Sequence, residues 1–372
     1  MSAESIAGIL KQINRNQFAV RRPQQSYRSG PVEIMVGNSL TRHYRLAEGA
    51  SITGTVERIK GRLTLTTIET LGGLAPEEFT KRPGFKDLVA VDPHERFDLG
   101  ASGNVSMRII DLIAPIGKGT RQLIVSPPKA GKTVLLEQIV GAIEQCDPQI
   151  RTLVLLIDER PEEVTLFRRA VKNAEVIAST IDNKTEDHVQ LARLMLAHVQ
   201  IELECGRDVV LVIDSLTRLA RAFNNQGRRG PARGHTMSGG LEAGVLEIPR
   251  QLFGLARKVE NGGSLTIIAT CLVDTGSRMD QLIFEEFKGT GNSEVVLNRS
   301  LAEARIFPAI DIPASGTRKE ARLYSEEQTR GLGTLRKVLS SYDQRQAAGA
   351  MFKLLEKFPD NDQFLKSMAA GG

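Results

Sequence analysis

Aromatic residues and cysteines are scarce in this 372-residue sequence, and tryptophan is absent. Aromatic side chains make up 5% of the chain, which argues against broad aromatic binding surfaces. The three cysteines, Cys146, Cys205 and Cys271, lie far apart and show no spacing typical of a metal site. A sparse, odd set of cysteines is typical of reduced thiols, so we expect a cytoplasmic protein without a disulfide framework.

Long hydrophobic runs are also missing. No stretch of eighteen apolar residues occurs, and residues 1–17 lack the apolar core of a secretion signal. We therefore expect neither secretion nor a membrane span. The composition, 41% hydrophobic and 25% charged, is instead that of an ordinary globular protein, and the length suffices for two domains.

The positive charge is concentrated near the N-terminus. The formal net charge is +5, and residues 1–62 carry ten lysines and arginines against four acidic residues. Such asymmetry favours a polyanionic partner for this segment. A solvated basic surface would give the same count, so charge alone leaves both interpretations open.

Hydrophobic patterning divides the chain in two. Residues 6–70 contain short alternating runs separated by turn-rich pieces, which predict a small β-barrel or sandwich. From about residue 105, apolar strands alternate with helical patterns, which predicts α/β architecture with a doubly wound parallel sheet. We place the domains at 1–72 and 101–372, joined by a linker at 73–100.

A phosphate-binding loop is predicted where an apolar strand at 121–126 meets a helical pattern. The spacing Ser126-x-x-x-x-Gly131-Lys132-Thr133 matches a P-loop, with serine in place of the first glycine. Backbone N–H groups would hold phosphates, Lys132 would reach the outer phosphate oxygens and Thr133 would bind Mg²⁺. The alternative is an ordinary Gly-Lys-Thr turn at a helix start.

Carboxylates follow two further predicted strands. Asp214 ends an apolar strand and is the candidate that organises Mg²⁺. Glu159 ends another and is the candidate that polarises the attacking water, with Asp158 as a structural cap. The alternative for Glu159 is a simple ion pair with Arg160. Arg318, in a late glycine-containing loop, is a candidate for neutralising transition-state charge.

Two basic loops follow strands of the predicted sheet. Residues 224–240 contain three arginines and no acidic residue, and residues 274–280 contain Arg278. A single basic loop is usually solvated surface. Two loops leaving strands beside a nucleotide site could grip a polyanion through its phosphates, without reading its sequence.

Several strings resemble signatures of the bacterial transcription termination factor Rho family. They are LIVSPPKAGKT, LLIDERPEEVT, VLVIDSLTRLAR, GGSLTIIAT, DTGSRMD, EEFKGTGN and FPAIDIPASGTRKE. The match is dense over residues 86–340 and weaker toward both ends. The resemblance implies a RecA-like P-loop NTPase domain behind an OB-type, cold-shock-like RNA-binding barrel. It also implies a homohexameric ring that uses ATP and Mg²⁺.

The resemblance assigns roles at the nucleotide site. Lys132, Glu159 and Arg318 match catalytic residues, with Arg318 as an arginine finger from the neighbouring subunit. Thr133 and Asp214 match the Mg²⁺ residues. The nucleotide-contacting set is Lys129, Ala130, Gly131, Lys132, Thr133, Val134, Arg160, Arg305 and Phe307, where Phe307 would stack on the base.

The resemblance also assigns residues to RNA. In the barrel these are Phe18 and Arg21, and in the two gripping loops they are Arg233, His235, Ser238, Gly276, Ser277 and Arg278. Three positions depart from the family pattern. Arg278 replaces a common lysine, His235 replaces a basic residue, and Met35 stands where an aromatic is expected. The reduced set of stacking aromatics predicts weaker RNA loading. The helical piece that precedes the barrel in the family has no counterpart here, so we expect a paralogue of the family.

Our leading hypothesis is a Rho-type ATP-dependent RNA translocase that releases transcripts, with single-stranded RNA and RNA polymerase as partners. One alternative is a Rho-like ring that binds RNA without terminating transcription. Another is a RecA-class ATPase acting on DNA or protein, such as a rotary or export ATPase.

Overall fold

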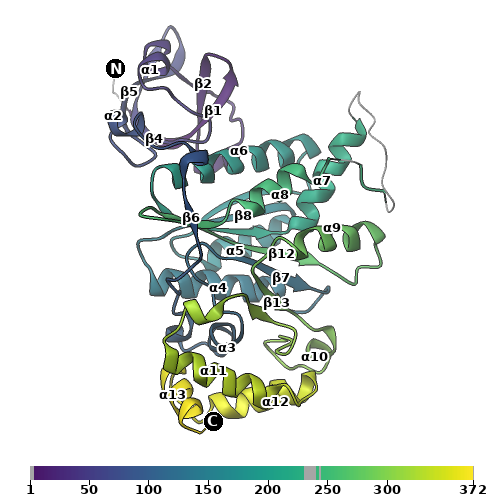
Figure 1. The fold of residues 1–372 in the computed structure, drawn as a ribbon. Coiled ribbons are helices and arrows are strands. Elements are labelled where there is room, and N and C mark those ends of the chain that lie inside the picture. The colour runs from purple at the N-terminus through teal and green to yellow at the C-terminus, as the bar shows by residue number, and fades with distance from the viewer. Residues whose placement is uncertain (1–3, 230–239, 243, 372) are drawn as a thin grey trace.

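The computed structural model describes residues 4–229, 240–242 and 244–371, with residues 228 and 229 described by their backbone alone. Figure 1 shows three parts in line: a small barrel at the N-terminal end, an α/β domain in the middle and a group of C-terminal helices at the far end. Within these ranges no helix is both long and apolar enough to span a bilayer.

The N-terminal part is a closed five-stranded barrel with strand order β1-β2-β3-β5-β4. Its elements are β1 (Glu4–Asn14), β2 (Gln17–Arg21), β3 (Ile34–Val36), α1 (Asn38–His43), β4 (Ser51–Ile59) and β5 (Arg62–Leu71), with the 3-10 turn η1 (Pro23–Gln25). In β4, buried and partly exposed residues alternate, as expected of a strand with one face on a core. The predicted OB-type barrel is confirmed.

The connecting segment packs against both neighbours. It contains α2 (Pro76–Phe79), η2 (Phe85–Asp87), β6 (Ala90–Val91) and η3 (Leu99–Ser102). The side chain of Phe79 is fully buried in the barrel core. Strand β6 pairs with β11 (Arg257–Val259) of the α/β domain. The segment therefore ties the two parts together rather than hanging free.

The α/β domain has a sheet with strand order β14-β13-β7-β12-β10-β8-β9. Its strands are β7 (Arg121–Ser126), β8 (Arg151–Glu159), β9 (Glu175–Thr180), β10 (Asp208–Asp214), β12 (Ser264–Leu272), β13 (Ser293–Val296) and β14 (Gly316–Thr317). Its helices are α3 (Val105–Ile113), α4 (Lys132–Cys146), α5 (Pro161–Ala170), α6 (Thr185–Glu204), α7 (Leu216–Arg229), α8 (Glu247–Gly254), α9 (Arg278–Lys288) and α10 (Arg299–Glu303). The strands from β13 to β9 run parallel, which confirms the doubly wound sheet.

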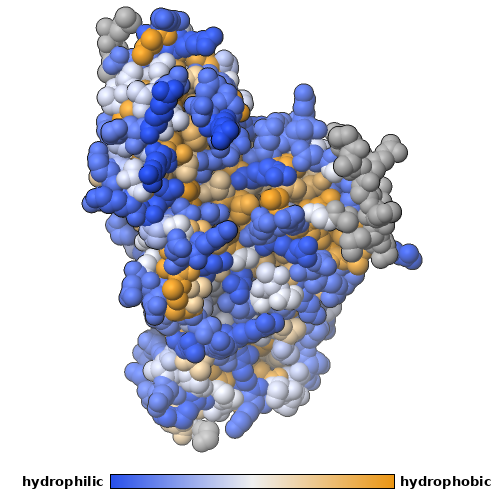
Figure 2. Space-filling model, turned by 45° about the horizontal axis from the view of Figure 1, so that its top comes forward, coloured by the Kyte–Doolittle hydropathy of each residue, from blue (hydrophilic) through white to orange (hydrophobic). Residues whose placement is uncertain are grey.

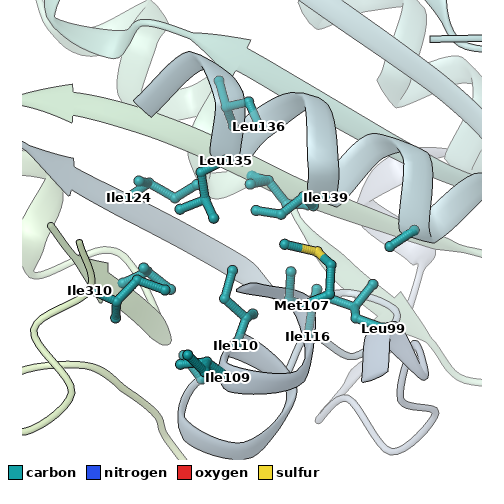
Figure 3. Packing of buried hydrophobic residues seen from close by; sticks show 14 of the residues in the cluster. Leu99, Met107, Ile109, Ile110, Ile116, Ile124, Leu135, Leu136, Ile139 and Ile310 are labelled. Carbon is teal, nitrogen blue, oxygen red and sulfur yellow. The ribbon is translucent and has the colours of Figure 1, made fainter. Parts of the chain in front are cut away.

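Both faces of this sheet are buried. In β10, Val210 and Val212 belong to one hydrophobic cluster, and Val209, Leu211 and Ile213 to the other. This is why the parallel strands read as continuous apolar runs instead of alternating ones. Figure 3 shows how helices α3 and α4 fill the first cluster against strand β7.

The C-terminal helices pack beneath α3. They are α11 (Glu326–Leu339), α12 (Gln344–Leu355) and α13 (Asn361–Ala370), preceded by η4 (Glu320–Arg322). Arg108 in α3 donates from Nε to the Asn361 side-chain oxygen at 3.0 Å, and Asn361 donates back to the Arg108 carbonyl at 3.0 Å. This reciprocal, buried pair fixes α13 on the domain.

The barrel is docked on α6 by buried polar contacts. Ser51 Oγ donates to Glu202 Oε1 at 2.7 Å, and Arg151 of β8 pairs with the other oxygen of Glu202 at 2.9 Å. The Gly49 carbonyl lies 2.6 Å from Nδ1 of the fully buried His198. A buried polar group is stable only when paired, so these contacts fix the barrel's position. Elsewhere, Figure 2 shows hydrophilic side chains over much of the visible face and apolar ones gathered across the α/β domain.

Candidate active site

Functional side chains gather where the parallel strands end. The carboxyl ends of β7, β8, β10 and β12 carry the P-loop, Glu159, Asp214 and residues 273–278, respectively. The polar chemistry of four segments that are far apart in sequence thus meets at one edge of the sheet. This is the edge at which open α/β sheets bind their ligands.

The P-loop runs from the end of β7 to the start of α4. Gly131 is the N-cap of α4 and has a φ of +91°, a conformation that favours glycine. Ser126 is the last residue of β7 and is extended, so this position does not require the glycine of the usual pattern. The first turn of α4 has no acidic residue, which leaves its N–H groups free to attract an anion.

Lys132 and Asp214 are in direct contact. The Lys132 ammonium donates to both carboxylate oxygens of Asp214, which is 2% exposed. Thr270 of β12 donates from Oγ1 to the same carboxylate at 2.8 Å. Sequence reasoning missed Thr270, because only the pairing of β12 with β10 brings it beside Asp214.

Thr133 and Asp214 suit a magnesium ion that keeps most of its ligands from water and phosphate. Among the described residues, no group of three or more acidic, histidine or cysteine side chains could form a protein cage for a metal. Mg²⁺ typically binds through one or two protein oxygens together with substrate phosphates. The residues present fit that mode.

Glu159 is held by Arg218. Its Oε1 accepts from Arg218 Nη2 at 3.0 Å and from the backbone N–H of Arg160 at 3.2 Å. Its Oε2 is buried without a hydrogen-bond partner in the described part of the chain. Burial raises the pKa of the Glu159 carboxyl above its ordinary value, and the charge of Arg218 opposes that rise. One oxygen is thus anchored, and the other is buried with no hydrogen-bond partner among the described residues.

The ion-pair partner of Glu159 is Arg218, not the guanidinium of Arg160. Arg218 also donates to the Asp158 carbonyl, so it fixes both ends of this short turn. Sequence reasoning missed Arg218. Arg218 lies one helical turn beyond Asp214, at the start of α7. An arginine at that spacing after a strand-end carboxylate is the sequence feature that points to it.

Phe307 lies beside the P-loop of its own protomer. A Cβ at Gly131 would lie 3.6 Å from Cε1 of Phe307, and the ring is 51% exposed. An exposed flat ring next to a phosphate loop suits a nucleotide base. Arg305 lies in the same connection and is exposed. Lys129, Val134 and Arg160 are likewise exposed around the P-loop and Glu159, whereas Ala130 is buried.

Arg318 lies at the opposite edge of the sheet. It follows β14, in which Thr317 pairs with Ser293, and Ser293 aligns with Gln122 near the start of β7. The length of β7 therefore separates Arg318 from the P-loop, on the order of 15 Å at strand geometry. Arg318 does not complete the site of its own protomer.

One candidate RNA loop is well anchored. Gly276 and Arg278 are exposed, and Ser277 caps α9 by accepting from the Asp280 N–H at 3.3 Å. The buried Asp280 also accepts from Thr275 at 2.6 Å. For the other loop, Arg233, His235 and Ser238 lie outside the described residues, whereas the carbonyl of Gly240, its last residue, accepts from Asn224 of α7 at 3.0 Å.

The two candidate RNA-binding residues of the barrel, Phe18 and Arg21, are both buried. Phe18 is 4% exposed and packs in the barrel core, so its ring presents no face for base stacking. Position along β2, rather than aromatic character, decides which side chains point inward. Arg21 is 8% exposed and pairs with Glu33 at 2.9 Å, so its charge is already compensated.

Comparisons with known proteins agree with this geometry. Residues 106–317 match the ATP synthase alpha/beta family, nucleotide-binding domain. A transcription termination factor Rho from Chromobacterium violaceum is 44% identical over 94% of this chain and 84% of its own length. That from Micrococcus luteus is 43% identical over 97% of this chain, which spans only 54% of that relative.

A solved structure is similar in fold. An ATPase from the type III secretion system of pathogenic bacteria aligns with a TM-score of 0.62 at 25% identity, covering 75% of this chain and 81% of its own. The shared nucleotide-binding architecture is therefore common to several ATPases. The much higher identity to the termination factors, over nearly the whole chain, decides between them: the chain belongs to the transcription termination factor Rho family.

Proposed function

We propose that this protein is an RNA-dependent ATPase of the Rho type. It assembles as a homohexameric ring in the cytoplasm, moves 5′→3′ along nascent RNA and releases transcripts from RNA polymerase. One observation carries the proposal: Lys132, Asp214 and Glu159 converge at one sheet edge, while Arg318 lies at the other.

The residues at the first edge account for binding and for activation of water. The N–H groups of the P-loop and the Lys132 ammonium hold the phosphates of ATP. The Glu159 carboxylate accepts a hydrogen bond from the attacking water and orients it toward the terminal phosphate. When bound, Mg²⁺ neutralises charge on the phosphate oxygens, and Thr133 and Asp214 are the residues that would hold it.

The edge of the sheet that carries Arg318 supplies an arginine to the nucleotide site of a neighbouring protomer. Charge accumulates on the transferring phosphoryl group, and an arginine provided from a neighbour can stabilise it. In a ring, Arg318 of one protomer would face the P-loop of the next. The apolar side chains gathered across the α/β domain are consistent with a surface that neighbours cover (Figure 2).

RNA contact is assigned to the loops that meet α7. Arg278 is exposed at the start of α9, within reach of a phosphate backbone. Helix α7 begins beside the catalytic carboxylates and contacts Asp280 and Gly240 farther along. A displacement of α7 on hydrolysis would therefore be transmitted to both loops.

The burial of Phe18 favours a second candidate, a Rho-like ring that binds RNA but does not terminate transcription. Base stacking is worth about 1–3 kcal/mol per base, so a barrel without an exposed ring at this position loads RNA less tightly. The intact set of Lys132, Asp214 and Glu159 supports an active ATPase in either case.

The test is ATP hydrolysis by the purified chain with no polymer, with poly(C), with other RNAs and with single-stranded DNA. Stimulation by RNA alone is expected, with Lys132→Ala as the inactive control. Turnover indifferent to every nucleic acid contradicts the proposal and favours an ATPase acting on another partner. Transcript release from a stalled polymerase then separates a terminator from an RNA-binding ring that only turns over ATP.

A further inference from the structure

Arg318 shares a small cavity with a second arginine. The cavity has a volume of about 210 Å³ at the starting edge of the sheet, and its wall includes Arg121, Asn292, Arg318, Lys319 and Asp92. Arg121 is the first residue of β7. It is only partly exposed, whereas Arg318 is exposed.

Arg121 is fixed by backbone carbonyls. Its Nε donates to the Thr290 carbonyl at 3.0 Å, and its Nη1 donates to the Ala256 carbonyl at 2.8 Å. In the described part of the chain it contacts no carboxylate. The guanidinium is therefore held in place with its positive charge uncompensated by an acid.

Asn292 connects the two arginines. Its side-chain oxygen accepts from the Arg121 N–H at 2.8 Å, and its backbone carbonyl accepts from the Arg318 N–H at 2.8 Å. The backbones of the two arginines are thus fixed to one residue. The Arg318 side chain, by contrast, is exposed.

The one acidic residue in the cavity wall is already engaged. Asp92 pairs with Lys319 at 2.9 Å and with Arg322 at 2.9 Å. Burial lowers the pKa of Arg121, and the nearby charge of Arg318 lowers it further, so the two guanidinium groups repel each other. With three cationic side chains against one carboxylate, this cavity wall is positively charged.

We infer that Arg121 is a positioning residue for the trans-acting Arg318. Its fixed positive charge prevents the Arg318 side chain from folding back onto its own protomer and keeps it extended toward the phosphates of the neighbouring site. The inference rests on the proposed function and names a residue that acts on the reaction only through Arg318.

The first test compares Arg121→Gln, which removes the charge, with Arg121→Lys, which retains it. In steady-state RNA-stimulated ATPase assays, Arg121→Gln should lower kcat about tenfold and leave KM for ATP within about twofold, because an arginine finger acts in the transition state. Arg121→Lys should recover most of kcat. Equal loss in both variants, with the ring intact, would show a structural role through the carbonyl bonds and overturn the inference.

Arg257→Gln is the matched control. Arg257 is also held by a backbone carbonyl, that of Leu255 at 3.0 Å, and it lines an adjoining cavity that contains Arg121 but not Arg318. The Arg257→Gln substitution should leave kcat unchanged. A double-mutant cycle with Arg318→Lys adds a second criterion: Arg121→Gln should have little further effect in that background. Additive losses would mean that Arg121 does not act through Arg318.

Asn292→Asp tests the same idea without altering either arginine. The new carboxylate would capture the Arg318 side chain and lower kcat as Arg121→Gln does. Phenylglyoxal labelling of Arg318, read by mass spectrometry, reports its freedom without turnover: labelling should slow in both variants, and unchanged labelling overturns the inference. A wild-type chain that shows no RNA-stimulated turnover contradicts the proposed function instead, and the labelling result still decides the role of Arg121.

Discussion

The guanidinium of Arg221 in α7 forms a two-pronged ion pair with the carboxylate of Asp280 in α9, with Nε at 2.8 Å from Oδ1. Asp280 is 1% exposed and also accepts from Thr275 in the loop that carries Arg278. Arg218, one turn earlier on α7, holds Glu159. One helix thus contacts both the hydrolytic carboxylate and the base of a candidate RNA loop.

Breaking this pair should uncouple RNA from hydrolysis. Arg221→Gln leaves the buried Asp280 carboxylate without the guanidinium that neutralises it, while the hydrogen bond from Thr275 remains. We expect loss of RNA stimulation while basal ATPase persists, measured as turnover with and without RNA. Arg299→Gln, which removes an exposed ion pair with Glu303, is the control and should change neither. Equal loss of basal and stimulated turnover would count against coupling through α7.

Binding and hydrolysis should separate at two residues. Lys132→Ala removes the ammonium that meets the phosphates, so ATP binding should fall below detection in a titration with a fluorescent nucleotide. Glu159→Gln keeps the shape but removes the water-polarising charge, so binding should persist while hydrolysis falls at least about a hundredfold. Rapid hydrolysis by Glu159→Gln would show that Glu159 does not polarise the attacking water.

The pH dependence of turnover should report the Glu159–Arg218 pair. Glu159 must be ionised to act, and the positive charge of Arg218 lowers its pKa against the effect of burial. Arg218→Gln removes the lowering influence, so the pKa of Glu159 rises further. The acid side of the kcat–pH profile should then shift to higher pH than in the wild type. A profile that moves to lower pH, or not at all, would show that another group controls this limb.

Mixing two inactive variants should restore activity if the site lies between protomers. Lys132→Ala chains keep Arg318, and Arg318→Ala chains keep Lys132, so a mixed ring contains some interfaces with both groups intact. We expect each variant alone to be inactive and the co-assembled mixture to hydrolyse ATP. Mixtures that stay inactive while subunit exchange is verified by mass spectrometry would argue that Arg318 does not act across an interface.

Docking of the barrel on α6 should be sensitive at Gly49. This residue has a φ of +86°, and a Cβ there would lie 2.4 Å from the Ala197 backbone. Gly61 has a φ of +82° with nothing within 4 Å, so it carries the same backbone strain without the clash. Gly61→Ala should cost about 1–2 kcal/mol of unfolding free energy and Gly49→Ala clearly more, measured by urea denaturation. Equal costs would mean that the two parts can separate without penalty.

The local motifs could be read from the sequence because their parts are consecutive. The P-loop is one strand, one loop and one helix start, so Gly131, Lys132 and Thr133 are placed by their immediate neighbours. The apolar runs of β8 and β10 likewise predicted a sheet buried on both faces and located Glu159 and Asp214 at strand ends. Residues that are adjacent in the chain must also be adjacent in space, so the sequence places such features to within a few residues.

The rest depended on contacts between distant segments. The inward direction of Phe18, the partnership of Arg218 with Glu159 and the placement of Arg318 beside Arg121 follow from strand order and pairing register. A one-residue change of register reverses the face of a strand, so pattern alone leaves these outcomes open. The phosphate loop, the two carboxylates and the family strings could be read without any tertiary contact. Which guanidinium lies beside which carboxylate followed from the folded arrangement, because side chains from different strands meet only after the sheet has ordered them.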